Sequence, residues 1–451
     1  MTALALVVLA AGMGTRMKSA TPKVLHKIAG RSMLGHVLHA GKALGAEKAV
    51  VVHGPDMAAV RNEAMGVIAA SEFAEQTERL GTGHAVSMAK AALSAFKGNV
   101  LVLYGDVPLV KAETLKGLLA KLDAKHKMAV LGFEAADPKG YGRLITKGKA
   151  VTDIREELDA KKTEKKVRLC NSGIIAIDNA LLWKLIPQLT NKNAKGEYYL
   201  TDLVKLATKA KTQVALALCS EIEVAGVNDR NQLSVLERQF QREARKDAMN
   251  NGATLIDPDT VYFSADTKLG KDVIVEPNVF FGAGVTVGDD VEILANSHIE
   301  GTTIASGARI GPFARLRPGA EIGEKAHVGN FVEVKKAKIG KGAKANHLTY
   351  IGDAIVGAGS NIGAGTITCN YDGYEKHLTE IGENVFVGSN SSLVAPVKIG
   401  AGANIAASSV ITSEVPADGL AITRPELKII SGWAKRYRAA KQAAKDAKRK
   451  G

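Results

Sequence analysis

Two different hydrophobic periods divide the chain. Over residues 273–411 an aliphatic residue recurs every six positions, with a few slips of register. An α-helix, with its 3.6-residue turn, would scatter such side chains around its surface. A left-handed parallel β-helix, in which three short strands make one coil, points the aliphatic residue of each hexapeptide inward. The pattern therefore predicts a solenoid over about 253–415, in which the glycine that often follows the aliphatic residue suits a tight corner.

The first part of the chain alternates apolar strand runs with amphipathic helices. Strands are predicted at 4–9, 49–53 and 100–104, and helices at 33–44, 83–96 and 114–122. This alternation predicts an α/β domain with a Rossmann-like, mostly parallel sheet covered on both faces. Ligands of such sheets bind at the carboxyl ends of the strands.

A separate helix is predicted over 228–251, where apolar residues recur at spacings of three and four. Asn228 or Asp229 is expected to cap its start. The expected organisation is a first domain over 1–227, a linker helix over 228–252, and the β-helix with a basic tail over 253–451.

The composition indicates the number of domains and the cellular compartment. A chain of 451 residues suits two or three domains. Its three cysteines have no metal-like or framework spacing, which fits free thiols in a reducing cytoplasm. The apolar stretch 1–11 has no basic n-region, so a buried strand is favoured over a signal peptide. No apolar run approaches the roughly 18 residues of a membrane span.

The net charge of +14 would suit a nucleic-acid partner, but half of it lies at one end of the chain. Residues 432–451 contain eight Lys or Arg and one Asp. A terminal charge run is usually a solvated tail. Because Trp433 and Tyr437 are the tail's only aromatic residues, no stacking surface and no nucleic-acid partner are expected.

A glycine-containing loop follows the first predicted strand, at Leu-Ala-Ala-Gly-Met-Gly-Thr-Arg-Met over 9–17. Glycines let backbone N–H groups approach phosphate oxygens. The third glycine of a dinucleotide site and the Gly-Lys-Ser/Thr of a Walker loop are both absent. Arg16 and Lys23 add cations, which suits a nucleoside triphosphate attacked at its α-phosphate. Asp106, after the strand 100–104, is either a turn residue or a Mg²⁺ ligand.

Four further motifs, together with this loop, indicate which protein family the chain resembles. They are Pro22-Lys23, Gln76 ahead of Leu80-Gly81-Thr82-Gly83-His84, Tyr104-Gly105-Asp106-Val107-Pro108 and Gly140-Tyr141-Gly142-Arg143. Together with the hexapeptide pattern, nearly the whole chain resembles the bacterial bifunctional N-acetylglucosamine-1-phosphate uridylyltransferase and glucosamine-1-phosphate N-acetyltransferase family.

The resemblance implies two reactions and a compartment. The solenoid would acetylate glucosamine-1-phosphate with acetyl-CoA, and the first domain would then transfer UMP from UTP to N-acetylglucosamine-1-phosphate, with Mg²⁺. The product would feed peptidoglycan and lipopolysaccharide synthesis. The enzyme would be a cytoplasmic homotrimer.

The resemblance also assigns residues in the first domain. Positions for UTP and UDP-N-acetylglucosamine are Leu9, Ala10, Ala11, Gly12, Lys23, Gln76, Gly81, Thr82, Tyr104, Gly105, Asp106, Gly142, Glu156, Asn171 and Asn228, of which Asp106 and Asn228 would hold the metal. Without the family, Glu156 would be interpreted as solvated surface and Asn228 as a helix cap. Arg16 and Lys23 are expected to stabilise charge at the α-phosphorus during a direct displacement.

Polar residues that break the repeat carry the solenoid's chemistry. A lone histidine such as His347 is commonly structural, but the family's segment makes it the general base, with Glu333 orienting it or stabilising its charge. Arg317 and Lys335 suit the acceptor's phosphate, although Lys335 is equally a solvated corner residue. The resemblance adds Tyr350 and Asn361 for the acceptor, and Ala364, Asn370, Tyr371, Ser389, Ala407 and Arg424 for acetyl-CoA.

Two alternatives remain at this point. One is a single-function sugar-1-phosphate nucleotidylyltransferase whose solenoid serves only trimerisation. The other is a scaffold or binding module, which the density of motifs in the first domain disfavours.

Overall fold

The computed structural model describes residues 2–148 and 150–450, which divide into two compact units. The first unit contains the chain up to Asn251, with Pro258–Thr267 and Phe281–Ala283. The second contains Gly252–Asp257, Lys268–Phe280 and the chain from Gly284 onward. Each unit is described by itself.

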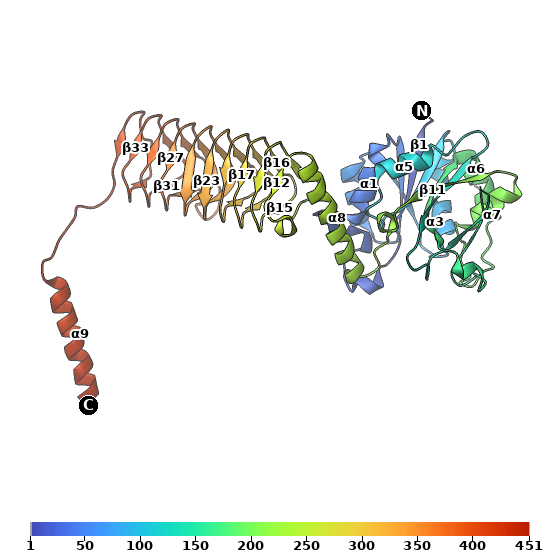
Figure 1. Ribbon diagram of the computed structural model, residues 1–451. Helices are drawn as coiled ribbons and strands as arrows, with labels where there is room; N and C mark the ends of the chain where they lie inside the picture. The colour runs from blue at the N-terminus through green and yellow to red at the C-terminus, as the bar shows by residue number, and fades with distance from the viewer. Residues whose placement is uncertain (1, 149, 451) are drawn as a thin grey trace. The chain divides into compact units, whose positions relative to one another are not determined.

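The first unit is built on a nine-stranded sheet (Figure 1). In spatial order its strands are β5 (Ser71–Glu75), β4 (Lys48–His53), β1 (Leu4–Leu9), β6 (Asn99–Tyr104), β10 (Leu169–Asp178), β7 (Met128–Glu134), β11 (Val214–Cys219), β9 (Ala150–Arg155) and β8 (Arg143–Lys147). The block β5-β4-β1-β6 is parallel throughout, as the sequence predicts. Beyond it the sheet is mixed, because β10 runs antiparallel to both β6 and β7.

Helices cover both faces of this sheet, which confirms the predicted layering. They are α1 (Met33–Ala43), α2 (Ala58–Val67), α3 (Thr82–Met88), α4 (Lys90–Leu93), α5 (Ala112–Leu119), α6 (Asn179–Leu185) and α7 (Asp202–Lys209). Alternate residues of β1 supply separate cores, with Leu6 packed in the cluster that includes α1, α2 and α5, and Val7 in the cluster that includes α3, α6 and α7. The helix predicted over 83–96 is divided, because Ala89 separates α3 from α4.

The long helix α8 (Arg230–Asn250) packs within the first unit. The Asp229 side chain accepts the Gln232 N–H and so caps the helix, as one of the two predicted candidates. Gln241, which is 3% exposed, exchanges two hydrogen bonds with the backbone of Phe263. The side chains of α8 thereby fix the segment 258–263 against it.

The second unit is a left-handed parallel β-helix, visible in Figure 1 as stacked coils. One sheet contains β12 (Thr254–Leu255), β14 (Ile274–Val275), β17 (Glu292–Ile293), β20 (Arg309–Ile310), β23 (His327–Asn330), β25 (Lys344–His347), β27 (Asn361–Ile362), β30 (Phe386–Val387), β33 (Asn404–Ile405) and β35 (Leu420–Ala421). The other strands are β13 (Lys268–Leu269), β15 (Phe280–Phe281), β16 (Thr286–Val287), β18 (His298–Ile299), β19 (Thr302–Ile304), β21 (Arg315–Leu316), β22 (Ala320–Ile322), β24 (Glu333–Ile339), β26 (Tyr350–Val356), β28 (Ile367–Cys369), β29 (Thr379–Ile381), β31 (Ser392–Val394), β32 (Val397–Ile399) and β34 (Val410–Ile411).

The six-residue repeat fills the interior of these coils. Its aliphatic residues from Val273 to Ile411 are no more than 4% exposed, which confirms the predicted solenoid. The glycines have a different reason from the one expected. A Cβ on Gly323 would lie 2.7 Å from the carbonyl oxygen of Ile339, so glycine is needed for the close stacking of coils. The left-handed corners are often occupied by other residues, such as Asn296 at φ 62° and Phe331 at φ 55°.

A loop over 370–378 leaves the coil between β28 and β29, and α9 (Trp433–Lys450) follows the last coil. In the described part of the chain, no helix combines the length and apolarity needed to cross a membrane.

Candidate functional sites

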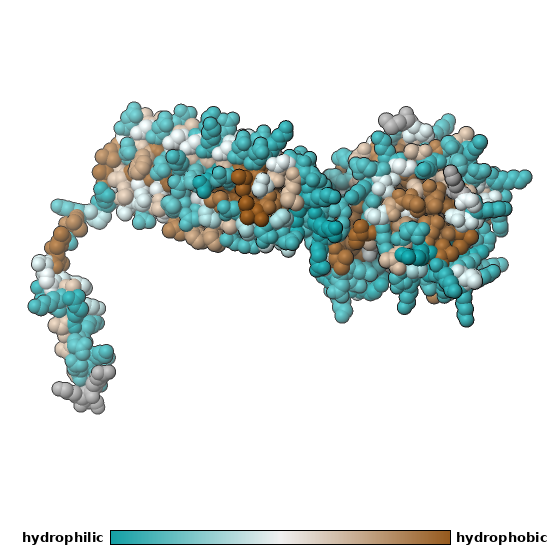
Figure 2. All heavy atoms as spheres, in the orientation of Figure 1, coloured by the Kyte–Doolittle hydropathy of each residue, from teal (hydrophilic) through white to brown (hydrophobic). Residues whose placement is uncertain are grey.

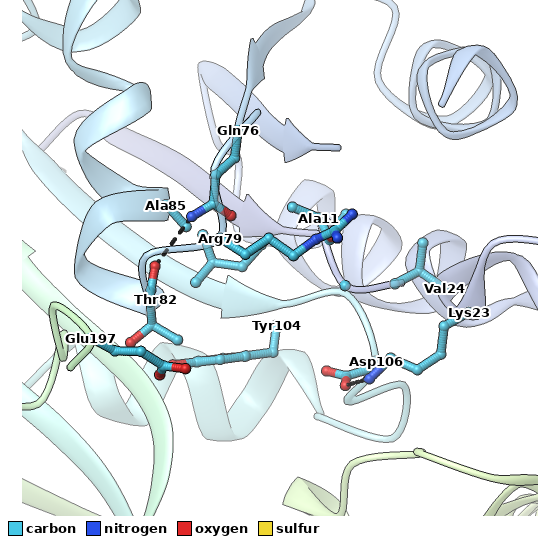
Figure 3. A pocket seen from close by; sticks show the side chains of 14 residues that line it. Ala11, Lys23, Val24, Gln76, Arg79, Thr82, Ala85, Tyr104, Asp106 and Glu197 are labelled. Carbon is cyan, nitrogen blue, oxygen red and sulfur yellow. Dashed lines mark hydrogen bonds and ion pairs between the residues drawn. The ribbon is translucent and has the colours of Figure 1, made fainter. Parts of the chain in front are cut away.

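A cavity of about 260 Å³ opens in the first unit beside the glycine loop (Figure 3). Ten residues predicted to bind the nucleotide line it: Leu9, Ala10, Ala11, Gly12, Lys23, Gln76, Gly81, Thr82, Tyr104 and Asp106. These residues follow or end β1, β5 and β6, so the cavity lies at the carboxyl ends of neighbouring parallel strands. Gly105 closes this end of the sheet by donating its N–H to the Leu9 carbonyl at 2.9 Å.

Gln76 is held rigidly at this cavity. It is 4% exposed, and its amide nitrogen donates to the Gly81 carbonyl at 3.2 Å and to Nδ1 of His84 at 3.1 Å. Gly81 has φ 109°, and a Cβ there would lie 2.7 Å from the Tyr198 carbonyl oxygen. Only glycine therefore fits at position 81. Because the hydrogen bonds to this turn use the amide nitrogen of Gln76, its amide oxygen is available for a ligand.

Three charged or polar side chains converge at the other end of the cavity. The Lys23 ammonium donates to Oδ2 of Asp106 and, at 3.4 Å, to Oδ1 of Asn228. The backbone carries Asn228 there, since the Val227 N–H donates to the Asp106 carbonyl at 3.0 Å. A cation thus already lies between the two oxygens predicted to hold Mg²⁺.

This donor set fits magnesium in a particular way. Mg²⁺ in phosphate-transfer sites is held by one or two protein oxygens together with substrate phosphates and water. Among the described residues there is no group of three or more His, Cys, Asp or Glu side chains arranged to hold a metal alone. Asp106 and Asn228 therefore suit a metal that arrives with the nucleotide.

Two arginines near the glycine loop are placed differently. Arg16, a predicted catalytic cation, is exposed on the short 3-10 helix Thr15–Met17 and is not part of the cavity lining. Arg79 does line the cavity, and its Nε donates to the Ala11 carbonyl at 3.2 Å. Arg79 is a site residue that the sequence does not indicate, because no motif or period marks it.

The three residues predicted to hold the sugar lie together outside the cavity lining. The Asn171 N–H donates to the Gly142 carbonyl at 2.8 Å, and a Cβ on Gly142 would lie 3.4 Å from Oε1 of Glu156. Burial raises the pKa of Glu156, whose carboxylate accepts a hydrogen bond from Thr201 at 2.9 Å. Glu156 is thus not the solvated surface residue that its charged neighbours suggest. The buried amide oxygen of Asn171 has no hydrogen-bond partner among the described residues.

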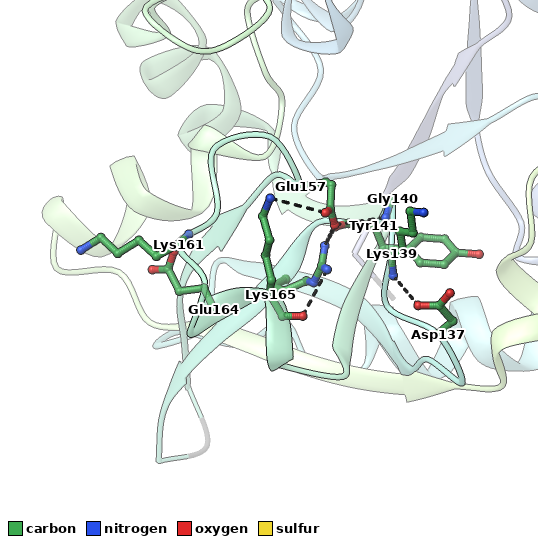
Figure 4. A network of polar contacts seen from close by, with 9 residues as sticks. Asp137, Lys139, Gly140, Tyr141, Glu157, Lys161, Glu164 and Lys165 are labelled. Carbon is green, nitrogen blue, oxygen red and sulfur yellow. Dashed lines mark hydrogen bonds and ion pairs between the residues drawn. The ribbon is translucent and has the colours of Figure 1, made fainter.

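A buried ion pair connects the two segments that carry Gly142 and Glu156 (Figure 4). Arg143 is 2% exposed and donates to the Glu157 carboxylate and to the carbonyl oxygens of Tyr141 and Lys165. Glu157 also accepts the Gly140 N–H at 3.1 Å. Gly142 and Glu156 are therefore each the chain neighbour of one member of the pair, so the pair fixes the backbone at both residues.

In the solenoid, His347 ends β25 directly beside Asn330 of β23. Nδ1 of the exposed imidazole lies 2.7 Å from Oδ1 of Asn330. An amide oxygen only accepts, so Nδ1 carries the hydrogen, and in the neutral imidazole the lone pair is then on Nε2. Glu333, which the sequence analysis placed as the partner of His347, instead accepts from Arg317 at 2.7 Å.

Other predicted acceptor residues occupy neighbouring coils. Glu333 is paired in register with Tyr350, and Lys335 with Gly352, between β24 and β26. The Asn370 amide donates to Asp353 at 2.5 Å and to the Tyr350 hydroxyl at 3.5 Å. Asn361 begins β27, in register with Lys344 of the coil that carries His347.

The predicted acetyl-CoA positions line up along one edge of the solenoid. The Asn390 N–H donates to the Ala364 carbonyl at 2.7 Å, and the Ser408 N–H to the Ser389 carbonyl at 2.8 Å. The guanidinium of Arg424 donates to the Ala407 carbonyl at 3.2 Å. Tyr371 lies in the loop 370–378, with the Lys376 ammonium 4.1 Å from its ring centre.

Comparison with known proteins covers both units. A MobA-like NTP transferase domain matches residues 6–169, and bacterial transferase hexapeptide repeats match 266–301, 301–336 and 378–413. A bifunctional protein GlmU from Paramagnetospirillum magneticum is 54% identical over 99% of both chains. One from Zymomonas mobilis is 53% identical over 97% of this chain and 98% of its own. The chain belongs to the bifunctional GlmU family.

Membership of the GlmU family decides between the hypotheses drawn from the sequence. The chain is an enzyme with uridylyltransferase and glucosamine-1-phosphate acetyltransferase activities. A solenoid that serves only trimerisation is not favoured. For this GlmU protein the open question becomes which side chains perform each reaction.

Three further residues contact the predicted site residues, namely Arg79, Asn330 and Asp353. Each contacts a predicted site residue through a hydrogen bond. A weak signal existed for the last two, since each precedes its partner by 17 positions, about one coil. All three cysteines are free, as predicted.

Proposed function

We propose that the cavity at the ends of β1, β5 and β6 performs uridylyl transfer, and that the edge around His347 performs acetyl transfer. One observation carries the first assignment. The side chains of Asp106 and Asn228, which are far apart in the sequence, both accept from the Lys23 ammonium at a cavity lined by the glycine loop. The proposed units of function are 1–227, a linker helix over 228–252, and 253–451.

In uridylyl transfer the chain positions two phosphates for a displacement. An oxygen of the sugar phosphate forms a bond to the α-phosphorus of UTP while the bond to pyrophosphate breaks. Mg²⁺ held by Asp106 and Asn228 would neutralise charge on the phosphate oxygens. The Lys23 ammonium would then contact those phosphate oxygens instead of the Asp106 carboxylate. Arg16, on the 3-10 helix Thr15–Met17, would add a second positive charge. No protein nucleophile is required.

The base would be recognised in the cavity and the sugar by the group Gly142, Glu156 and Asn171 outside its lining. The constrained carboxamide of Gln76 offers its oxygen to the imide N–H of uracil, supported by Gly81 and Thr82. On the sugar side, the unpartnered amide oxygen of Asn171 is a ready acceptor for a hydroxyl or amide N–H. Glu156 and Gly142 complete that side.

In acetyl transfer, His347 acts as general base. Nε2 takes a proton from the amine of glucosamine-1-phosphate as the nitrogen attacks the thioester carbonyl, and the CoA thiolate then leaves. Arg317 and Lys335 would bind the acceptor's phosphate, and Glu333 would hold Arg317 in place. Tyr350 and Asn361 would complete the acceptor site, and the edge carrying Ala364, Ser389 and Ala407 would accommodate the CoA arm with Asn370, Tyr371 and Arg424.

We further propose that the protein works in the cytoplasm as a homotrimer. Hexapeptide solenoids are compatible with trimers, and the substrates are cytoplasmic metabolites. Its product, UDP-N-acetylglucosamine, would enter peptidoglycan and lipopolysaccharide synthesis.

The test is product analysis by mass spectrometry, with glucosamine-1-phosphate, acetyl-CoA, UTP and Mg²⁺ supplied together. The wild-type chain should yield UDP-N-acetylglucosamine, and omission of acetyl-CoA should abolish it. Asp106→Ala should accumulate N-acetylglucosamine-1-phosphate. An Asp106→Ala protein that still releases pyrophosphate at the wild-type rate would remove Asp106 from the site.

A further inference from the structure

Arg79 lines the cavity of the first unit, and the proposed uridylyl transfer gives it no role. Exposed arginines need no special explanation in themselves, and the surface of the first unit carries many hydrophilic side chains in Figure 2. Arg79 differs from such arginines in its position. It lines the same cavity as Gln76 and Lys23, and Figure 3 shows its side chain extending toward Ala11.

One hydrogen bond holds the guanidinium of Arg79 at the start of the glycine loop. Its Nε donates to the carbonyl oxygen of Ala11 at 3.2 Å, and Ala11 is only 8% exposed. A Cβ built on Gly54 would lie 3.5 Å from Nη2 of Arg79 and 3.5 Å from the same carbonyl oxygen. The guanidinium therefore lies beside the ends of β1 and β4, next to the backbone that continues into Gly12.

The terminal donors of this guanidinium are unused. Among the residues that the structure describes, neither Nη1 nor Nη2 takes part in a hydrogen bond, and no carboxylate forms an ion pair with Arg79. Lys23 also lines the cavity but differs from Arg79, because its ammonium is already paired with Asp106. An arginine holds its N–H donors in a fixed planar fork. The terminal N–H groups of Arg79 are thus available to a ligand in the cavity.

We propose that Arg79 binds the phosphate chain of UTP. This assignment rests on the proposed uridylyl transfer, in which uracil lies at Gln76 and the α-phosphate near Lys23. A guanidinium held at Ala11 stands beside the glycine loop, whose N–H groups suit phosphate oxygens. Two N–H groups of a guanidinium can bind two phosphate oxygens in parallel, which the ammonium of a lysine cannot do. Arg79 thereby adds a positioned positive charge to that of Lys23.

Two other roles for Arg79 compete with phosphate binding. The guanidinium would stack on the uracil ring, or its hydrogen bond to Ala11 would serve only to hold the glycine loop. Charge favours the phosphates, because the triphosphate carries negative charge that the cavity must balance and uracil carries none. The three roles also predict different losses of affinity. Only phosphate binding predicts a loss that depends on the phosphates of the ligand.

The experiment is titration of the full chain with uridine, UMP, UTP and inorganic pyrophosphate at one Mg²⁺ concentration. Calorimetry gives the dissociation constants, and ligand-observed NMR gives those of the weakest ligands. Arg79→Gln should weaken UTP binding about tenfold or more and leave that of uridine within about twofold. Arg79→Lys keeps the charge and loses the planar fork, so its affinity for UTP should lie between those of wild type and Arg79→Gln. A loss already present with UMP assigns the contact to the α-phosphate, whereas a loss confined to UTP and pyrophosphate assigns it to the leaving group.

Arg168 supplies the matched control. Like Arg79 it is exposed and donates from Nε to a backbone carbonyl, that of Ala135 at 2.9 Å, but it does not line the cavity. Arg168→Gln should leave all four affinities unchanged. Gln76→Ala should weaken uridine, UMP and UTP alike, because it removes the proposed contact with the base.

Three results overturn the assignment of Arg79 and leave the nucleotide site standing. In the first, Gln76→Ala weakens UTP binding and Arg79→Gln does not. In the second, Arg79→Gln weakens uridine as much as UTP, so the side chain acts on the base or only supports the loop. In the third, Arg168→Gln loses as much affinity as Arg79→Gln, so the effect is one of overall charge. If Gln76→Ala instead leaves every ligand unchanged, the cavity is not the uridine-nucleotide site, and the proposed function falls together with the role of Arg79.

Discussion

The two units of this GlmU protein assemble polar sites by different routes. In the first unit, Lys23 meets Asp106 across 83 positions of sequence and Asn228 across 205. In the solenoid, the contacts of Arg317 with Glu333, Asn330 with His347, and Ala407 with Arg424 span 16 or 17 positions. An α/β sheet thus gathers a site through its global topology, whereas a β-helix does so between adjacent coils.

This difference has a consequence for exposure. The first unit holds polar groups of its proposed site below the surface, since Gln76 and Asn171 are 4% and 8% exposed. The solenoid's core is filled by its aliphatic repeat, so His347 and its neighbours stand on the outside. Enclosure at the second site must then come from substrate, from the loop 370–378, or from another subunit of the proposed trimer.

The largest expected effect tests whether the two sites are independent. His347→Ala removes the general base, and acetyl transfer should fall about 10²–10⁴-fold. Uridylyl transfer from N-acetylglucosamine-1-phosphate should remain within twofold of wild type, because His347 belongs to the second unit. Coupled thiol-release and pyrophosphate-release assays measure the two rates in one preparation. Equal loss of both would show that the sites are not separate.

The second prediction concerns a local contact in the first unit, between residues 14 positions apart. Glu157→Ala leaves the buried Arg143 without its carboxylate and loosens the segments that carry Gly142 and Glu156. Arg143 is 2% exposed and would lose its charged partner, so the first unit should melt at a lower temperature. The KM for N-acetylglucosamine-1-phosphate should rise about tenfold, which corresponds to roughly 1.4 kcal/mol, with a smaller change for UTP.

The matched control for Glu157 lies in the solenoid. Glu324→Ala breaks the Lys341–Glu324 pair, whose side chains are 67% and 56% exposed. Solvent screens an ion pair this exposed, so neither KM nor the melting temperature should change appreciably. If the KM for UTP rises as much as the KM for the sugar phosphate in Glu157→Ala, the pair supports the whole cavity rather than its sugar side.

The same contrast explains what the sequence could predict. Inward residues of the solenoid are visible because the repeat itself encodes them, and all proved buried. The parallel block β5-β4-β1-β6 was predictable from alternating strands and helices. The antiparallel position of β10 between β6 and β7 was not, because long-range strand order leaves no local pattern.

Side-chain partners were the least predictable feature. Glu333 is predicted to orient His347 or to stabilise its charge, and the sequence does not show that its carboxylate accepts from Arg317 of the preceding coil. Asn330 lies in register with His347, but an asparagine among many polar corner residues carries no signal of its own. Arg143 was identified only as part of a motif, and its contact with Glu157 depends on the register of the antiparallel strands β8 and β9, which no motif shows.

The third prediction concerns the short-range route in the solenoid. Asn330→Ala removes the acceptor that fixes the Nδ1–H tautomer of His347. A free choice of tautomer and ring orientation should lower kcat for acetyl transfer about tenfold, with little change in KM for glucosamine-1-phosphate. Asn330→Asp should instead move the pH profile of acetyl transfer upward, because a carboxylate beside the ring favours imidazolium and delays formation of the neutral base. An unchanged profile in Asn330→Asp would mean that Asn330 does not contact the ring in the working enzyme.

The smallest expected effect concerns Glu156 and the cost of enclosing a carboxylate. Burial raises its pKa in the folded unit above the value in the unfolded chain, so the folded state binds more protons between those two values. Stability must therefore fall as pH rises through that window, and the loss is complete above the folded pKa. Glu156→Gln keeps an oxygen that accepts from Thr201 and abolishes this loss. The variant should melt like wild type at pH 4 and slightly higher at pH 8, in thermal unfolding followed at both pH values. Its KM for N-acetylglucosamine-1-phosphate should nevertheless rise, since the sugar would lose a charged acceptor. A Gln variant that melts lower at pH 8 would show that the Thr201 contact outweighs the desolvation of the carboxylate.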